Sequence, residues 1–108
     1  MSGEERPLEE RLRELLASMK DWERKPIISI GSIIVELVKL PKRELKRGLE
    51  PEKLAIHVRM KDAFKGVIVE NEKELEDLAM AVQNRKVREV ARALEAVNEE
   101  RKVVEYSL

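Results

Sequence analysis

The sequence predicts an α+β domain: a small antiparallel sheet of about four strands, with an N-terminal helix, a short inserted helix and C-terminal helices. Apolar residues recur at helical spacing near the N-terminus and over the last third of the chain. The segment Ile27–Leu40 is rich in β-branched residues, which favour strands, and Leu54–Met60 alternates between two sets of side chains. Short links between strands favour antiparallel pairing. With 108 residues, a single domain spanning 1–108 is expected.

The first helix is predicted over 7–23. Pro7 suits a helix start because its missing N–H would have no partner there. A leucine stripe follows, and Trp22 extends it before Pro26 ends the helix. We expect Trp22 to pack in the core, although its neighbours Lys20, Arg24 and Lys25 are basic.

The sheet is predicted over 27–70. Gly31–Ser32 divides the apolar run into strands 27–30 and 33–40, and a Gly-x pair suits a tight hairpin. One long bent strand is the alternative. The next strand is 54–60, and the loop "KDAFKG" leads to a fourth strand around 67–70.

A short helix is predicted over 41–47, begun by Pro41 and stopped by Gly48. The segment 39–47 holds one acid and five bases: Lys39, Lys42, Arg43, Lys46 and Arg47. Like charges at i, i+4, such as Lys42 and Lys46, oppose a helix by a few tenths of a kcal/mol. A solvated helix face tolerates that easily, so the segment is either such a face or a surface for an anionic partner.

The C-terminal element is predicted to be helical over 71–104. Asn71 and Glu74 have the spacing of a capping box, and Gln83–Asn84 is a predicted interruption. Steps of three and four then give an oligomer-interface seam: Val87, Val90, Leu94, Val97 and Val104. Either a short coiled-coil dimer or an ordinary amphipathic helix on the sheet would produce this spacing.

Composition narrows the function classes. Charged residues make up 41% of the chain, against roughly 25% in an average protein, while Cys and Thr are absent. This bias is typical of hyperthermophile proteins, whose surfaces carry ion-pair networks. The lack of Cys excludes disulfides and thiol catalysis, and no apolar run approaches the roughly 18 residues of a membrane span. We expect a soluble cytoplasmic protein.

Positive charge is concentrated in the middle of the chain. Residues 24–66 carry eleven basic and five acidic side chains, whereas 1–23 and 67–108 are each net acidic. A basic middle between acidic ends predicts a localised positive surface.

Catalytic motifs are absent from the sequence. His57 is the only histidine and has no serine near it, and the four glycines form no phosphate-binding loop. One His with no Cys is a poor set of metal ligands. We therefore expect a non-enzymatic protein without cofactor or metal; an enzyme that lacks a recognisable motif is the third alternative.

His57 and Phe64 are candidate binding residues because each is predicted to lie beside basic side chains. His57 is predicted to share the solvent face of its strand with Arg59 and Lys61, where it either is merely solvated or meets a partner. Phe64 lies in a predicted loop between Lys61 and Lys65. Aromatic rings beside basic residues are typical of single-stranded nucleic-acid platforms.

The segment Val38–Val58 resembles AbrB-type swapped-hairpin regulators, which are DNA-binding dimers, through Leu40-Pro41-Lys42 and Gly48-Leu49-Glu50-Pro51. Glu52-Lys53 stands where that family has Gly-Asp. A second resemblance spans most of the chain, namely Trp22–Pro26, the hairpin at Gly31, the basic insert, "IHVRMKDAFKGVIVE" and the seam Val87–Val104. In layout these segments resemble the archaeal ThermoDBP-type single-stranded DNA-binding proteins and their RNA-binding relatives. That resemblance implies a small α+β domain with a basic cleft and a C-terminal dimerisation element.

The expected function is non-enzymatic binding of nucleic acid, single-stranded RNA or DNA, by a homodimer. A protein-interaction or assembly module of a hyperthermophile complex is the alternative. The predicted nucleic-acid-binding residues are Lys39, Lys42, Arg43, Lys46, Arg47, His57, Arg59, Lys61, Phe64 and Lys65.

Overall fold

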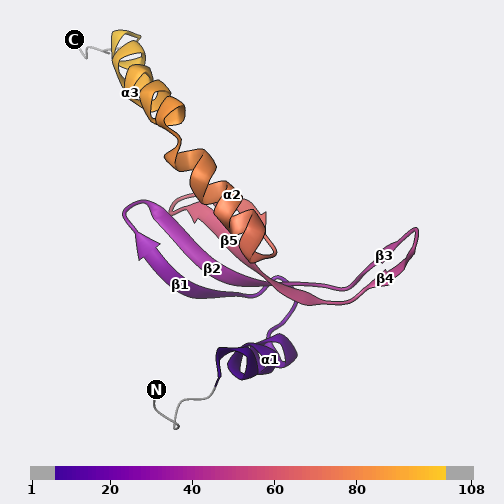
Figure 1. Cartoon of the computed structure of the whole chain (residues 1–108). Coiled ribbons are helices and arrows are strands. Elements are labelled where there is room, and N and C mark those ends of the chain that lie inside the picture. Colours follow the sequence, from indigo (N-terminus) through magenta and orange to yellow (C-terminus); the bar gives the residue numbers. More distant parts are fainter. Residues whose placement is uncertain (1–6, 102–108) are drawn as a thin grey trace, which may run out of the picture. The chain divides into compact units, whose positions relative to one another are not determined.

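The computed structural model describes residues 7–101 and confirms the α+β class (Figure 1). The chain divides after Asn71 into two compact units. Among the described residues, the first unit holds one helix and six strands, and the second unit holds two helices. None of the helices within 7–101 is long and apolar enough to cross a membrane.

Helix α1 (Leu8–Ser18) begins after Pro7, whose carbonyl accepts from the backbone N–H of Glu10 and Arg11. Its predicted end at residue 23 is wrong. Residues 20–23 form a turn instead, and the Trp22 N–H donates to the Lys39 carbonyl at 2.7 Å. That bond attaches the turn to the sheet, which removes Trp22 from the helical stripe.

Four strands form the main sheet: β1 (Arg24–Ile30), β2 (Ile33–Leu40), β5 (Lys53–Met60) and β6 (Val67–Val69). Their order is β1-β2-β5-β6, and every neighbouring pair is antiparallel. Gly31 has φ +56°, a left-handed conformation that glycine adopts without strain, so the predicted hairpin is confirmed and the single bent strand is not formed.

Strands β3 (Arg43–Leu45) and β4 (Gly48–Glu50) form a separate two-stranded sheet, and the helix predicted over 41–47 is therefore wrong. We call residues 42–50 the arm. Lys46 and Arg47 lie at its tip, and Gly48 has φ +131° immediately after them. The glycine that was interpreted as a helix stop thus supplies the backbone freedom of a hairpin turn. Figure 1 shows the arm projecting beyond the ends of β2 and β5.

Gly66 allows the segment before β6 to return close to β5. A Cβ at this position would overlap the Val58 carbonyl oxygen and press on the Arg59 backbone, 2.8 Å away. No other residue type fits without a backbone shift. Gly66 therefore fixes where the preceding loop, residues 61–66, lies against the sheet.

The second unit consists of α2 (Glu72–Gln83) and α3 (Arg85–Glu100). The predicted interruption between them is confirmed: the Asn84 side chain caps α3 by accepting from the Lys86 N–H at 2.8 Å. Val104, the last residue of the predicted seam, lies outside the described residues.

Candidate functional site

One face of the main sheet carries a cluster of polar and charged side chains that is largely removed from solvent. Residues that pair across antiparallel strands project to the same face, and the register sets Glu36 on β2 opposite His57 on β5. Both side chains are almost fully buried, so the solvent exposure predicted for His57 is wrong. The Ala55–His57 side of β5 is more deeply buried than the Leu54–Ile56–Val58 side, the reverse of the predicted orientation.

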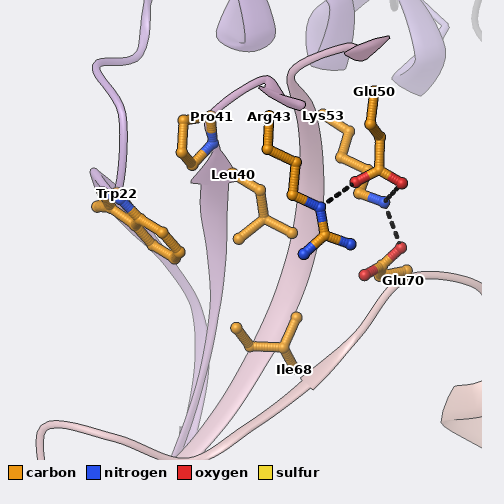
Figure 2. A pocket seen from close by; sticks show the side chains of 8 residues that line it. All are labelled: Trp22, Leu40, Pro41, Arg43, Glu50, Lys53, Ile68 and Glu70. Carbon is orange, nitrogen blue, oxygen red and sulfur yellow. Dashed lines mark hydrogen bonds and ion pairs between the residues drawn. The ribbon is translucent and has the colours of Figure 1, made fainter. Parts of the chain in front are cut away.

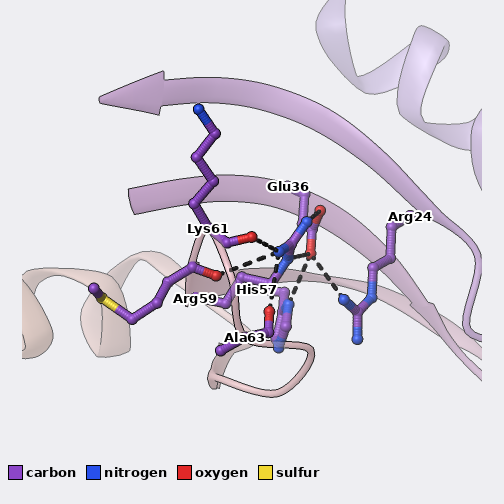
Figure 3. Close-up of polar contacts among 7 residues, drawn as sticks. Arg24, Glu36, His57, Arg59, Lys61 and Ala63 are labelled. Atoms are coloured by element: carbon purple, nitrogen blue, oxygen red, sulfur yellow. Dashed lines mark hydrogen bonds and ion pairs between the residues drawn. The ribbon is translucent and has the colours of Figure 1, made fainter. Parts of the chain in front are cut away.

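Glu36 holds this cluster together (Figure 3). Its carboxylate lies 2.9 Å from His57 Nδ1, 2.8 Å from Arg59 Nε and 3.3 Å from Arg24 Nη1. We call these four residues the Glu36 cluster. Burial alone would raise the pKa of Glu36, but the hydrogen bonds from Arg59 and His57 outweigh it and hold the pKa below its ordinary value. Glu36 is therefore ionised at neutral pH.

Arg59 connects the Glu36 cluster to the 61–66 loop. Its Nη1 donates to the carbonyls of Met60, Lys61 and Ala63 at 3.0–3.3 Å. The guanidinium group of Arg59 thus bonds Glu36 on one side and the loop carbonyls on the other. Arg59 therefore positions the loop and is not available to contact a ligand from the surface. Lys61, by contrast, is exposed and points away from the cluster (Figure 3).

Phe64 lies in this loop and is 76% exposed. The Arg24 guanidinium carbon sits 4.3 Å from the centroid of its ring, a cation–π contact worth about 0.5–1 kcal/mol at an exposed site. Arg24 thus joins the ring to the Glu36 cluster. The loop and its aromatic side chain are held by two arginines that share one carboxylate.

Trp22 is also at the surface, 58% exposed, so the core position predicted for it is wrong. It has φ +69°, a conformation that costs a non-glycine residue about 1–2 kcal/mol. The turn that imposes it is closed by the Glu23 N–H, which donates to the Lys20 carbonyl, and by the Lys20 N–H, which donates to the Glu23 carboxylate. The chain accepts this strain and leaves a large ring in solvent, which marks Trp22 as a functional candidate.

Two hollows lie on either side of Trp22 and share Trp22 and Ile68. The first, the Phe64 hollow, has a volume of about 270 Å³ and is lined by Trp22, Arg24, Val38, His57, Phe64, Lys65, Gly66 and Ile68. The second, the arm hollow, has a volume of about 340 Å³ and is lined by Trp22, Leu40, Pro41, Arg43, Glu50, Lys53, Ile68 and Glu70. We call the two hollows together the groove; their linings include residues of the 61–66 loop and of the arm.

The predicted binding residues do not all lie on one surface. Phe64, Lys65, His57 and Arg43 line the groove, although His57 is buried in its floor. Arg59 lies behind the loop. Within 7–101, no hydrogen bond or ion pair engages the side chains of Lys42, Lys46, Arg47, Lys61 and Lys65, all of them exposed.

Lys39 does not belong to this surface. Its ammonium group donates to the carbonyls of Leu16 and Met19 at 2.8 and 2.9 Å and lies 3.3 Å from the Glu52 carboxylate. Those carbonyls end α1 and have no partners within the helix, so a cation is favourable there. The side chain is only 7% exposed, and its predicted availability to a partner is wrong.

Sequence reasoning missed Arg24 and the surface position of Trp22. The one local signal was the basic neighbourhood of Trp22, which is formed by Lys20, Arg24 and Lys25. Arg24 acquires its role only through strand pairing, which brings it near Glu36.

Comparison with protein-family models, curated proteins and solved structures found no match to this chain.

Proposed function

We propose that this protein binds single-stranded RNA or DNA in the groove, without catalysing a reaction. The observation that carries the proposal is the pair of exposed rings, Trp22 and Phe64, lining one hollow together with Arg24 and Lys65. Proteins that bind single strands combine stacking rings with a cationic path for the backbone.

The rings favour single strands over duplex. An aromatic side chain can stack only on a base that has left its own stack, and the bases of a duplex are stacked and paired. Val38 and Ile68 add an apolar floor, which suits the face of a base better than a phosphate. The positive side chains around the groove would meet the phosphates that follow each stacked base.

Charge supplies the second part of the proposal. Lys61 and Lys65 flank Phe64, while Lys42, Lys46 and Arg47 lie on the arm. None of these five side chains forms an ion pair within residues 7–101, so their charges are available to phosphates. Each phosphate that they neutralise releases counterions, so affinity should fall with salt by a slope of about −0.7 per contact for a single strand.

The experiment is a binding titration of labelled single-stranded RNA, single-stranded DNA and duplex over a range of salt concentrations. With about four contacts, the plot of log affinity against log salt should have a slope near −3. The double variant Lys46→Gln/Arg47→Gln should reduce the steepness by about 1.4, whereas the matched variant Lys86→Gln/Arg88→Gln on α3 should leave it unchanged. Salt-insensitive binding, or no binding at low salt, would reject the proposal.

We further propose that the protein is a homodimer through α3. Val87, Val90, Leu94 and Val97 follow steps of three, four and three, and all four are about half exposed in the single chain. Such a stripe is apolar surface that a second copy would cover by knobs-into-holes packing.

Leu94→Lys should raise the dimer dissociation constant more than tenfold, because it places a charge in the seam. Sedimentation equilibrium measures this, with Glu95→Lys, next to the seam, as the matched control. A monomeric wild-type protein would contradict the dimer. If Lys46→Gln/Arg47→Gln dissociates the oligomer and leaves RNA binding unchanged, the arm belongs to an assembly interface instead.

A further inference from the structure

The two hollows differ in chemistry, although they share Trp22 and Ile68. The Phe64 hollow has no carboxylate among its lining residues. The arm hollow has two, Glu50 and Glu70. A groove that served only the phosphate backbone would gain nothing from acids, because a carboxylate repels a phosphate. The acids in the arm hollow therefore need another explanation.

These acids belong to a row of alternating charge along one wall (Figure 2). Arg43 Nε lies 2.7 Å from Glu50 Oε1, Lys53 Nζ lies 3.4 Å from Glu50 Oε2, and Lys53 Nζ lies 2.6 Å from Glu70 Oε1. Hydrogen-bond donors, Arg43 and Lys53, therefore alternate along the wall with hydrogen-bond acceptors, Glu50 and Glu70. The hydrogen bond from Arg43 lowers the pKa of Glu50, so this carboxylate is an acceptor at neutral pH.

The remainder of the arm hollow suits a flat apolar ring. Leu40 and Ile68 lie between the charged row and Trp22, which stands on the opposite side (Figure 2). A base resting over these side chains would have its face against apolar carbon and its edge toward Glu50 and Lys53. A planar heterocycle with a hydrogen-bonding edge is thus the ligand that this hollow fits.

Glu50 and Lys53 together discriminate among the four bases. A carboxylate offers two oxygen acceptors side by side and pairs best with two adjacent donors. The pairing edge of guanine carries two such donors, N1–H and N2–H, next to the acceptor O6. Adenine and cytosine have a single amino donor on that edge, and uracil has a single N3–H between two carbonyl oxygens.

We propose that the arm hollow is a base-reading subsite that prefers guanine, with Glu50 accepting from N1–H and N2–H and Lys53 donating to O6. This inference rests on the proposed single-strand binding and adds sequence preference to it. The Lys53–Glu50 contact, at 3.4 Å, is the longest and therefore the weakest in the row. Lys53 can give up this contact to donate to O6 with little loss of interaction energy. The Phe64 hollow, which has no acceptor wall, accepts any base by stacking.

The test uses four single-stranded RNA oligomers, an all-uridine 12-mer and three copies with one central guanine, adenine or cytosine. Wild-type protein should bind the guanine oligomer about tenfold more tightly than the other three, as expected for one bidentate base contact. Glu50→Gln should abolish this preference, because an amide has only one acceptor oxygen.

Glu52→Gln is the matched control: it removes the same charge two residues away, from a side chain that does not line the hollow. It should keep the guanine preference. Equal binding of all four oligomers by the wild type, or a preference that survives Glu50→Gln, would overturn the inference and leave the proposed function standing. Absence of binding by every oligomer at low salt would reject both.

Discussion

Trp22→Ala is expected to weaken binding of single-stranded RNA or DNA by about tenfold or more, because stacking on one ring contributes roughly 1–3 kcal/mol per base. The ring lines both hollows, so its loss removes a wall from each. Phe64→Ala should weaken binding to a similar extent. Ile30→Ala is the control, since Ile30 is 66% exposed but lies at the hairpin end of β1, outside the groove. Fluorescence anisotropy of a labelled oligomer measures all three.

The left-handed backbone at Trp22 allows the ring to be separated from the fold. Trp22→Gly removes the same ring but suits φ +69°, so it should be about 1 kcal/mol more stable to unfolding than Trp22→Ala. Both variants should nevertheless lose affinity equally. Recovery of binding in the glycine variant would show that backbone strain, rather than the ring, explained the loss.

Glu36→Gln is expected to lower the free energy of unfolding by about 2–4 kcal/mol, since it leaves the half-buried guanidinium groups of Arg24 and Arg59 without their counter-ion. Arg24 and Arg59 would lose the carboxylate through which they hold Phe64 and its loop. RNA affinity should therefore fall together with stability. Chemical denaturation at pH 7 measures the first effect, and Glu44→Gln on the exposed arm should change it by less than about 0.5 kcal/mol.

The ionised Glu36 also predicts that the free energy of unfolding decreases as the pH falls below about 4.5. The pKa of Glu36 is lower in the folded protein than its ordinary value of 4.5, so its contribution to stability is complete above that pH. It is lost as the pH falls from about 4.5 through the folded pKa. Between pH 5 and 3 the wild type should lose more stability than Glu36→Gln. Parallel curves for the two proteins would contradict a stabilising role for the ionised Glu36.

Local sequence patterns predicted the strands of the main sheet. β-Branched residues placed β1 and β2, Gly31 marked their hairpin, and alternation identified β5. The same local logic failed for the arm. Its long charged side chains have good helix propensity, and nothing within 41–47 reveals that Arg43 and Glu50 pair across two strands.

The groove was only partly predictable, because it too depends on contacts between residues far apart in the sequence. Phe64 and Lys65 stand out locally, as a ring in a basic loop. The burial of His57 depends on Glu36, 21 positions earlier, and the position of Trp22 depends on a hydrogen bond to Lys39. Lys39 looked like the first of five binding cations until its contact with the end of α1 was known. Contacts between distant segments decide which charges face outward, and local spacing does not contain them.

Trp22 fluorescence reports directly on whether a nucleic acid enters the groove, because Trp22 is the only tryptophan in the chain. A base stacked against its ring should quench the emission. Single-strand binding in the groove predicts saturable quenching by single-stranded RNA or DNA at low salt, weaker quenching at higher salt, and none with a duplex of equal length. Emission that single strands leave unchanged at low salt, or that duplex quenches equally, would contradict it.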